Sequence, residues 1–188
     1  MHNPDRAAPA PEPAAAPRAE RWKPSVTVAA IVVREDADGQ RRFLLVEEHT
    51  AEGLRLNNPA GHLDPGESPL EAVVREALEE TARDFTPTHL LGVYLSRFRR
   101  PATGEDITYL RMAYGGTAGP ADPARRLDEG IVRTLWLTLD EVRASADRHR
   151  SPLVLRCIED HEAGVRLPLE AIWADASLRD PHIKPQPG

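Results

Sequence analysis

The sequence predicts an α/β fold in which a mixed β-sheet carries helices on both faces. Several runs of β-branched and apolar residues are typical of buried strands, and other segments combine helix-capping residues with apolar residues at helical spacing. The two kinds of segment do not alternate strictly along the chain. A doubly wound parallel sheet is therefore disfavoured, and a mixed sheet between helical layers is expected.

The expected strands are bounded by turn residues. The first two, 25–35 and 42–49, are separated by the turn sequence DADGQR and should form a hairpin. A short strand is expected within 54–63, broken by Pro59 and Gly61. The remaining strands are predicted at 88–98, 107–116 and 131–138.

The principal helix is predicted over 69–82. Ser68 can cap its N-terminus, and Pro69 suits the first helical position because the N–H that proline lacks would have no partner there. Shorter helices are expected after Thr138 and over 151–164. Apolar residues recur in the principal helix at i, i+3, i+4 and i+7 and predict a core-facing stripe: Leu70, Val73, Val74 and Ala77.

Composition narrows the class of protein. The formal net charge of −6 argues against binding to a nucleic-acid polymer or an anionic membrane. The chain has a single cysteine, Cys157, so an intrachain disulfide is excluded. Its apolar neighbours predict a core residue, and the absence of a disulfide framework fits a protein of the reducing cytoplasm. No segment resembles a secretory signal or a membrane span. We expect an Ala/Pro-rich disordered tail at 1–21, one domain at 22–173 and a flexible tail at 174–188.

An acidic cluster lies in the second half of the principal helix. Glu76, Glu79 and Glu80 share one patch at i, i+3 and i+4, and Glu67 in the preceding turn can fold toward it. Mg²⁺ would remove their mutual repulsion, because it prefers oxygen ligands and sites shared with phosphates. Arg75 can orient one carboxylate, and the metal could polarise a phosphoryl oxygen and activate a water. A solvated acidic helix surface is the alternative interpretation.

The region from Gly61 to Glu80 resembles the signature of the Nudix (MutT-like) hydrolase family. Five residues separate Gly61 from Glu67, and seven more precede the sequence REALEE at 75–80. The resemblance implies an α/β/α sandwich around a mixed, curved sheet, with a loop–helix–loop that binds Mg²⁺ or Mn²⁺ and hydrolyses nucleoside diphosphates linked to another group. It also implies roles for individual residues: metal ligands at Glu76, Glu79 and Glu80, assistance from Glu67, orientation by Arg75, and loop shaping by Gly61 and Gly66.

Further segments resemble the NudJ-type subgroup of bacterial phosphatases. They are KPSVTVAAIVV, LNNPAGHLDPGES and RSPLVLRCIEDHEAGVRLPLEAI, within 22–172. The resemblance implies Mg²⁺-dependent hydrolysis of nucleoside di- or triphosphates or thiamine-type pyrophosphates, by water attack on phosphorus, in a monomer or homodimer. The alternatives are an ADP-ribose or nucleotide-sugar pyrophosphatase and a non-catalytic nucleotide sensor. Sensors of this fold generally lose catalytic glutamates, whereas this chain keeps all four.

One position departs from the family pattern. Ala82 stands where the family usually has glycine, and Arg83 follows where an aliphatic residue is usual. Glycine there suits a left-handed helix end, which costs other residues roughly 1–2 kcal/mol. We therefore expect the helix to run on or to end differently, with Phe85 supplying the apolar contact.

Residues outside the signature complete the candidate site. Asp128 and Glu129 precede the strand at 131–138 and could supply a base or a further ligand, with Glu80 as the alternative base. Arginines in and near the strands at 88–98 and 107–116 could hold phosphates. The candidates are, for catalysis, Glu80, Glu79, Arg75 and Glu129, and, for substrate binding, Gly61, Arg97 and Arg111.

Overall fold

A computed structural model of the chain describes residues 21–100, 103–180 and 182. The predicted N-terminal tail, apart from Arg21, lies outside the described residues. The strands are β1 (Ser25–Glu35), β2 (Arg41–Thr50), β3 (Gly53–Asn57), β4 (Ala60–His62), β5 (Phe85–Arg99), β6 (Asp106–Ala118) and β7 (Ile131–Thr138). The helices are α1 (Pro69–Thr81), α2 (Leu139–Ala144) and α3 (Leu153–Glu162), with 3₁₀ turns η1 (Ala146–Arg148), η2 (Leu169–Ala171) and η3 (Ala176–Arg179).

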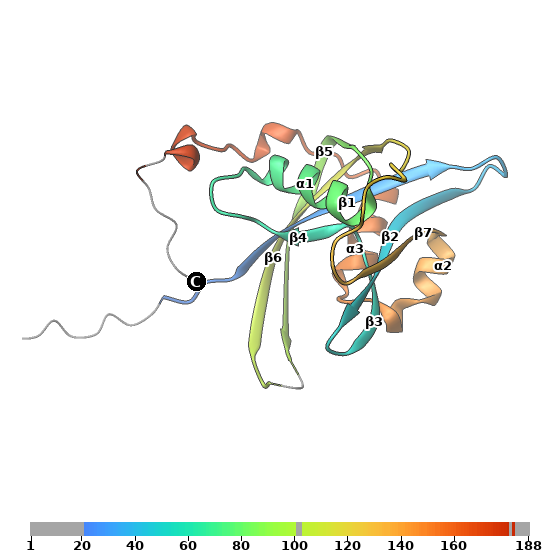
Figure 1. Cartoon of the computed structure of the whole chain (residues 1–188), viewed down its shortest axis with the longest axis horizontal. Coiled ribbons are helices and arrows are strands. Elements are labelled where there is room, and N and C mark those ends of the chain that lie inside the picture. Colours follow the sequence, from blue (N-terminus) through green and yellow to red (C-terminus); the bar gives the residue numbers. More distant parts are fainter. Residues whose placement is uncertain (1–20, 101–102, 181, 183–188) are drawn as a thin grey trace, which may run out of the picture.

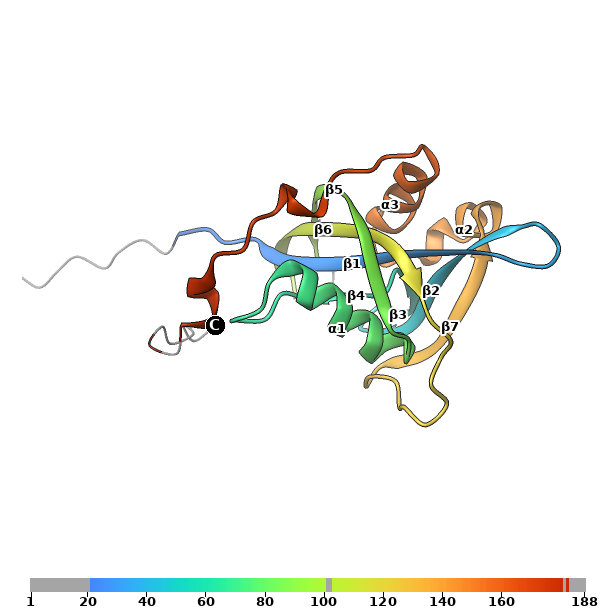
Figure 2. The ribbon, with the colours of Figure 1, turned by 90° about the horizontal axis from the view of Figure 1, so that it is seen from above.

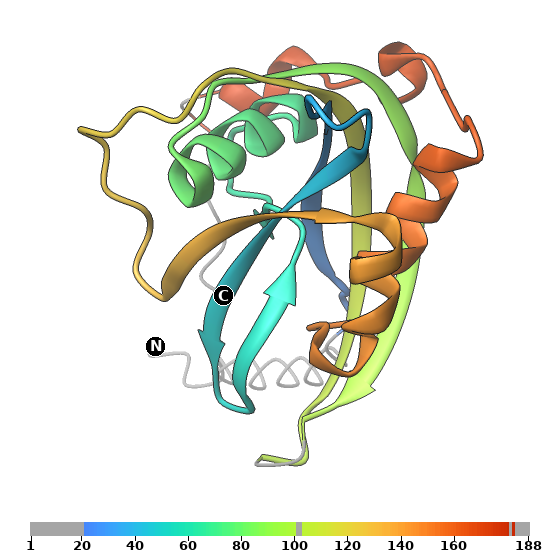
Figure 3. The same cartoon turned by 90° about the vertical axis from the view of Figure 1, so that its right-hand side faces the viewer.

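The predicted architecture is confirmed: a curved, mixed sheet lies between helical layers. The strand order is β3-β2-β1-β6-β5, with β4 also paired to β1 and β7 to β2. The sheet is mixed because β1 runs parallel to β6 and antiparallel to β2 and β4. Helix α1 covers one face, and α2 and α3 cover the other (Figures 1, 2 and 3).

Strand β1 separates two hydrophobic cores. Its side chains alternate between the faces, so Val28 and Val32 pack toward Val73 of α1, while Ile31 packs toward Ile158 of α3. Cys157 is buried in the core between the sheet and α3, as its apolar neighbours predicted. Both faces of β1 are therefore buried, which explains its nearly continuous apolar sequence.

The segment predicted as one broken strand forms two strands with different partners. β3 pairs with β2, whereas β4 pairs with β1. The chain crosses between them at Pro59, whose carbonyl accepts a 2.8 Å hydrogen bond from the Ala30 N–H. This crossing brings Gly61 and the loop that follows it alongside α1.

Helix α1 begins as predicted. The Ser68 side chain accepts a hydrogen bond from the Glu71 N–H, and the Glu71 carboxylate accepts one from the Ser68 N–H. This reciprocal capping box satisfies two N–H groups at the start of the helix. Thr138 and Glu141 form the same arrangement at α2, where the sequence also predicted a threonine cap.

The predicted core stripe of α1 is wrong at one position. Val74 is 36% exposed, whereas Ala72 is fully buried beside Val73. The helix is rotated so that Glu76 and Glu80 also lie on its buried side. The carboxylates and the apolar stripe consequently do not occupy separate faces, because the sheet curves around this side of the helix.

The expectation that Ala82 prevents a left-handed helix end is also wrong. Helix α1 stops at Thr81, and Ala82 adopts φ +54° and ψ +31°. Its N–H donates a 2.9 Å hydrogen bond to the Leu78 carbonyl. Tertiary contacts impose this conformation: the Ala82 carbonyl accepts a 2.8 Å bond from the Asp122 N–H, and Phe85 is buried as expected.

Replacing Ala82 with glycine is expected to stabilise the protein by about 1 kcal/mol, because glycine adopts the left-handed conformation without the steric penalty of a Cβ atom. The melting temperature should rise by roughly 2–4 °C for a chain of this size. Ala163→Gly is the matched control, since this helix-capping alanine has φ −68°. It should be neutral or slightly destabilising, and equal gains for both variants would contradict the explanation.

The described part of the C-terminal segment contacts the domain. Residues 174–180, assigned to the tail by sequence, include η3, and Arg179 forms an ion pair with Glu71 of α1. Leu178 of η3 also lies close to the loop before α1. A Cβ atom built on Gly66, whose φ is +91°, would lie 3.5 Å from the Leu178 carbonyl oxygen. None of the helices formed by the described residues has the length and apolar character needed to cross a membrane.

Candidate active site

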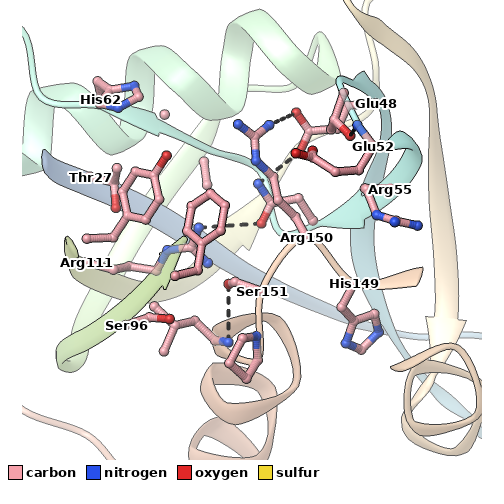
Figure 4. A pocket seen from close by; sticks show the side chains of 18 of the residues that line it. Thr27, Glu48, Glu52, Arg55, His62, Ser96, Arg111, His149, Arg150 and Ser151 are labelled. Atoms are coloured by element: carbon pink, nitrogen blue, oxygen red, sulfur yellow. Dashed lines mark hydrogen bonds and ion pairs between the residues drawn. The ribbon is translucent and has the colours of Figure 1, made fainter. Parts of the chain in front are cut away.

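A cavity of about 810 Å³ opens beside the buried end of α1. Its walls come from the β2–β3 hairpin, from β5 and β6, and from the segment leading into α3 (Figure 4). Gly61, Glu76 and Glu80 line one part, and Thr27 and Arg111 line the sheet floor. Arginines 55, 97, 99, 100 and 150 also contribute to the lining. An acidic helix thus faces a cavity with many basic groups, a combination suited to a cation and an anionic substrate together.

Glu80 is the most perturbed carboxyl group of the cavity. It is 8% exposed, and one carboxylate oxygen accepts a 2.8 Å hydrogen bond from the Ala60 N–H. Burial raises its pKa to about 8, and the charges of Glu48, Glu76 and Asp128 act in the same direction. Burial also raises the pKa of Glu76, against the opposing effect of Arg75. Both groups therefore lie where a positive charge would be strongly favoured.

Arg75 binds three of the four signature carboxylates, although the sequence suggested one. Its Nη1 donates to Glu76 at 2.8 Å and to Glu79 at 2.9 Å, while Nε and Nη2 donate to Glu67 at 3.1 and 2.7 Å. Nη2 also donates to the His62 carbonyl at 3.0 Å. Hydrogen bonding to Arg75 lowers the pKa of Glu67. The guanidinium therefore ties the loop before α1 to the helix.

The structure divides the four glutamates into two pairs. Glu76 and Glu80 are buried and line the cavity, whereas Glu67 and Glu79 lie outside its lining. Arg75 links the two pairs, because it binds Glu76 as well as Glu67 and Glu79. Within residues 21–100, 103–180 and 182, no three His, Cys, Asp or Glu side chains are already gathered as a metal-ligand cluster.

Gly61 is required by close packing. A Cβ atom built at this position would lie 2.1 Å from the Glu76 carboxyl carbon and from one of its oxygens. Such contacts are impossible, so only glycine leaves space for the Glu76 carboxylate beside β4. The predicted loop-shaping role of Gly61 thus has a steric basis at the cavity wall.

The loop before β7 brings Asp128 near the glutamates, and not Glu129. The Asp128 N–H donates a 3.0 Å bond to the Glu79 carbonyl, and its charge contributes to the raised pKa values of Glu76 and Glu80. Asp128 and Glu129 are both exposed and neither belongs to the cavity lining, but Asp128 is the one whose charge acts on Glu76 and Glu80. Of these two candidate bases, Asp128 is the better placed.

The two candidate phosphate-binding arginines differ in environment. Arg97 is exposed at the rim and forms an ion pair with Asp106. Arg111 is only 7% exposed and points into the cavity region from β6. The rim also carries two stacked aromatic rings, Phe98 and Tyr109, with centroids 6.1 Å apart.

Sequence reasoning missed several polar residues of the cavity. Glu48 accepts a hydrogen bond from Asn57 at 3.2 Å and forms an ion pair with Arg150, which Figure 4 shows at one side of the cavity. Thr27 lies on the floor in β1. The available signal was a charged or hydroxylic side chain within an otherwise apolar strand, as in LLVEEH and SVTVAA.

The donor set of the acidic helix fits a hard divalent cation. All four side chains offer carboxylate oxygens, and two of them are buried with pKa values raised by desolvation and mutual repulsion. A positive charge at this position would reverse both effects. The residues that would hold the cation are Glu76 and Glu80, with Glu79 and Glu67 on the adjacent turn and loop.

The fold and the acidic helix together define a hydrolase of the Nudix class, and the comparisons with known proteins agree. Residues 24–157 match the family model of the NUDIX domain. The chain belongs to the Nudix family and is a Nudix hydrolase. Enzymes of this family generally use divalent metal ions and act on small-molecule pyrophosphate compounds.

Named relatives extend the match beyond the signature. The chain is 36% identical over 152 residues to "Phosphatase NudJ" of Escherichia coli K12, covering 80% of this chain and 92% of that protein. A solved NUDIX hydrolase from Nitrosomonas europaea is 45% identical, with a TM-score of 0.72 over 81% of this chain and 98% of that one. The NUDIX domain of Shewanella oneidensis NrtR, solved with ADP ribose, shares the fold at 20% identity and a TM-score of 0.61, covering 79% and 92% of the two chains.

Proposed function

We propose that this Nudix hydrolase cleaves the pyrophosphate bond of nucleoside di- or triphosphates or of thiamine-type pyrophosphates, in a Mg²⁺-dependent reaction by water attack on phosphorus. The observation that carries the proposal is the pair of buried carboxylates with raised pKa values, Glu76 and Glu80, at a cavity that also contains a buried arginine. The similarity to "Phosphatase NudJ" supports a phosphatase activity.

The chain's own residues have distinct proposed roles. Bound Mg²⁺ would supply Lewis-acid stabilisation of phosphoryl charge and a more acidic water. Glu76 and Glu80 would hold the cation, and Arg75 positions Glu79 and Glu67 by its hydrogen bonds. The arginines of the cavity stabilise the negative charge of the substrate.

Glu80 is the proposed general base. It lines the cavity, whereas Glu79 does not, so its carboxylate is the better placed of the two to accept a proton from an attacking water. Asp128 is the alternative, because it lies close enough to influence the pKa of Glu80.

The direct test measures release of phosphate and pyrophosphate from a panel of pyrophosphate compounds, with Mg²⁺ and with chelator. We expect metal-dependent release by the wild type and about a hundredfold loss in Glu79→Gln, because this change removes a carboxylate from the metal-binding group. Glu159→Gln, on the exposed side of α3, is the control and should retain activity.

The pattern of products decides between related activities. Release of phosphate identifies a phosphatase, and release of pyrophosphate identifies a pyrophosphatase. Preference for ADP-ribose or a nucleotide sugar would replace the proposed substrate class. Binding of nucleotides without turnover of any compound would contradict the enzymatic proposal and indicate a sensor.

A further inference from the structure

Arg111 is a buried cation without a counter-charge among the described residues. Its Nη2 makes one long contact, 3.5 Å to Asn57 Oδ1, while Nε and Nη1 are buried without a hydrogen-bond partner. No carboxylate of residues 21–100, 103–180 and 182 forms an ion pair with it. An uncompensated buried charge is strongly unfavourable, so this guanidinium is arranged to receive an anion from outside the chain.

The carboxylates nearest to Arg111 are committed to other partners. Glu48 accepts hydrogen bonds from Asn57 and Arg150. Glu80 accepts one from the Ala60 N–H. Their charges influence Arg111 only at a distance, and burial lowers the pKa of Arg111 because the guanidinium has lost its water. Arginine nevertheless stays protonated in proteins, so the need for an anion remains.

A second unsatisfied donor lies directly beside Arg111. Thr27 of β1 is the register partner of Arg111 in the parallel pairing of β1 with β6. Its Oγ1 is buried without a partner, and both residues line the cavity. Figure 4 shows the two side chains next to each other on the sheet floor. Neighbouring strands lie about 4.8 Å apart, so one phosphoryl group with several acceptor oxygens can contact both.

This pair of donors is connected to the acidic helix through the sheet. Thr27 pairs on its other side with His62 of β4, and Ala60 of the same strand donates to Glu80. The cavity is continuous from Glu76 and Glu80 to Thr27 and Arg111. A single substrate can therefore occupy both ends, with one phosphoryl group at Arg111 and the organic group directed to the rim.

The burial of Arg111 selects the kind of phosphoryl group. At 7% exposure, Arg111 is accessible mainly through the cavity that it lines. A terminal phosphoryl group has one substituent, which can leave toward the cavity mouth. A phosphoryl group that carries a substituent on each side would need space for a second substituent at this buried position.

We propose that Arg111 and Thr27 form an oxyanion subsite for the terminal, singly substituted phosphoryl group of the substrate. This inference rests on the proposed function and deepens it by assigning to Arg111 and Thr27 the recognition of the free terminal phosphate that the proposed substrates share. Diphosphates substituted at both ends, such as ADP-ribose and nucleotide sugars, lack the group that this subsite recognises.

The subsite is tested by calorimetric binding of inorganic pyrophosphate to the full chain in chelator. Arg111→Gln should weaken binding by about ten- to a hundredfold and Thr27→Val by about three- to tenfold, as expected for loss of charged and neutral hydrogen bonds. Arg143→Gln, an exposed arginine of α2 outside the cavity, should leave binding unchanged. Unchanged binding in Arg111→Gln, or no binding by the wild type at millimolar pyrophosphate, overturns the proposal.

Thermal unfolding without ligand separates this role from a structural one. Because Arg111 has no ion pair to lose, Arg111→Gln should keep or raise the melting temperature, whereas a structural anchor would lower it. A large decrease in Arg111→Gln together with normal pyrophosphate binding by Thr27→Val contradicts the subsite. If Arg111→Gln does not fold, Arg111→Lys replaces it and should weaken binding by the loss of the guanidinium's paired donors.

Steady-state kinetics distinguish failure of this inference from failure of the proposed function. Arg111→Gln should raise KM for a nucleoside diphosphate, with a smaller change in any hydrolysis of ADP-ribose. A wild type that hydrolyses only doubly substituted diphosphates refutes the subsite and leaves a pyrophosphate hydrolase. Arg111-dependent pyrophosphate binding without hydrolysis of any compound refutes the proposed function and leaves the subsite.

Discussion

Glu80→Gln is expected to abolish hydrolysis while making the metal-free protein more stable at alkaline pH. Loss of the proposed base and metal ligand should lower kcat by about a thousandfold. The stability effect follows from burial, which raises the pKa of Glu80 to about 8 from an ordinary 4.5. Glutamine can still accept the hydrogen bond that the Ala60 N–H donates, so the main change is removal of the ionisable group.

The sign of the pH dependence is defined by proton binding. Below pH 4.5 Glu80 is protonated in both the folded and the unfolded state, and its ionisation costs no stability. Between pH 4.5 and about 8 the unfolded state releases this proton first, so the wild type loses stability as pH rises. The advantage of Glu80→Gln should therefore grow through this range and reach roughly 2–4 kcal/mol by pH 8.5.

Urea unfolding in chelator at pH 5.5 and pH 8.5 measures this difference. Glu170→Gln, an exposed position in η2, is the control and should show no pH-dependent gain. Added Mg²⁺ should reverse the order of stability at pH 8.5, because the cation binds the ionised wild-type carboxylate and stabilises the folded state. Equal stability of wild type and Glu80→Gln at both pH values would contradict the burial of this charge.

Gly61→Ala is expected to reduce activity by about a hundredfold with little loss of stability. The added Cβ would lie 2.1 Å from the Glu76 carboxylate, so that carboxylate must move away from β4. Displacement of about 1 Å at a reacting site can cost two orders of magnitude in rate. The fold should tolerate the change, because the clashing atoms belong to the end of a flexible side chain and the backbone is left in place.

A double-mutant cycle identifies the cause. If Gly61→Ala acts through Glu76, the double variant Gly61→Ala/Glu76→Gln should be no less active than Glu76→Gln alone. Gly92→Ala is the matched control, since a Cβ there makes only an ordinary 3.4 Å contact with the Tyr94 ring. Additive losses in kcat, or a fall in melting temperature that parallels the loss of activity, would exclude the displacement of Glu76.

Local sequence rules predicted much of the fold. β7 occupies Ile131–Thr138 as expected, and α1 starts at Pro69 behind the Ser68 cap. These features depend on side-chain periodicity and on contacts within a few residues, so the sequence alone can predict them. The left-handed helix end at Ala82 could not be predicted in this way, because it is imposed by a hydrogen bond from Asp122, a residue of a distant loop.

The glutamates show the same division between local and long-range information. Their spacing identified the acidic helix, the family resemblance and a partnership with Arg75. It did not reveal that Glu76 and Glu80 line the cavity while Glu67 and Glu79 lie outside its lining, since that division depends on the rotation of α1 against the curved sheet.

Arg111 and Thr27 depend still more on the fold. Arg111 was one of several candidate arginines in the sequence, and Thr27 had no visible role. They become neighbours because β1 pairs in parallel with β6, a contact between segments more than eighty residues apart. The composition and signature of the chain thus identify a Nudix hydrolase with an acidic helix. The pairing of distant strands determines which side chains line the cavity and which buried donors remain free for a substrate, because burial and strand register are properties of the assembled sheet.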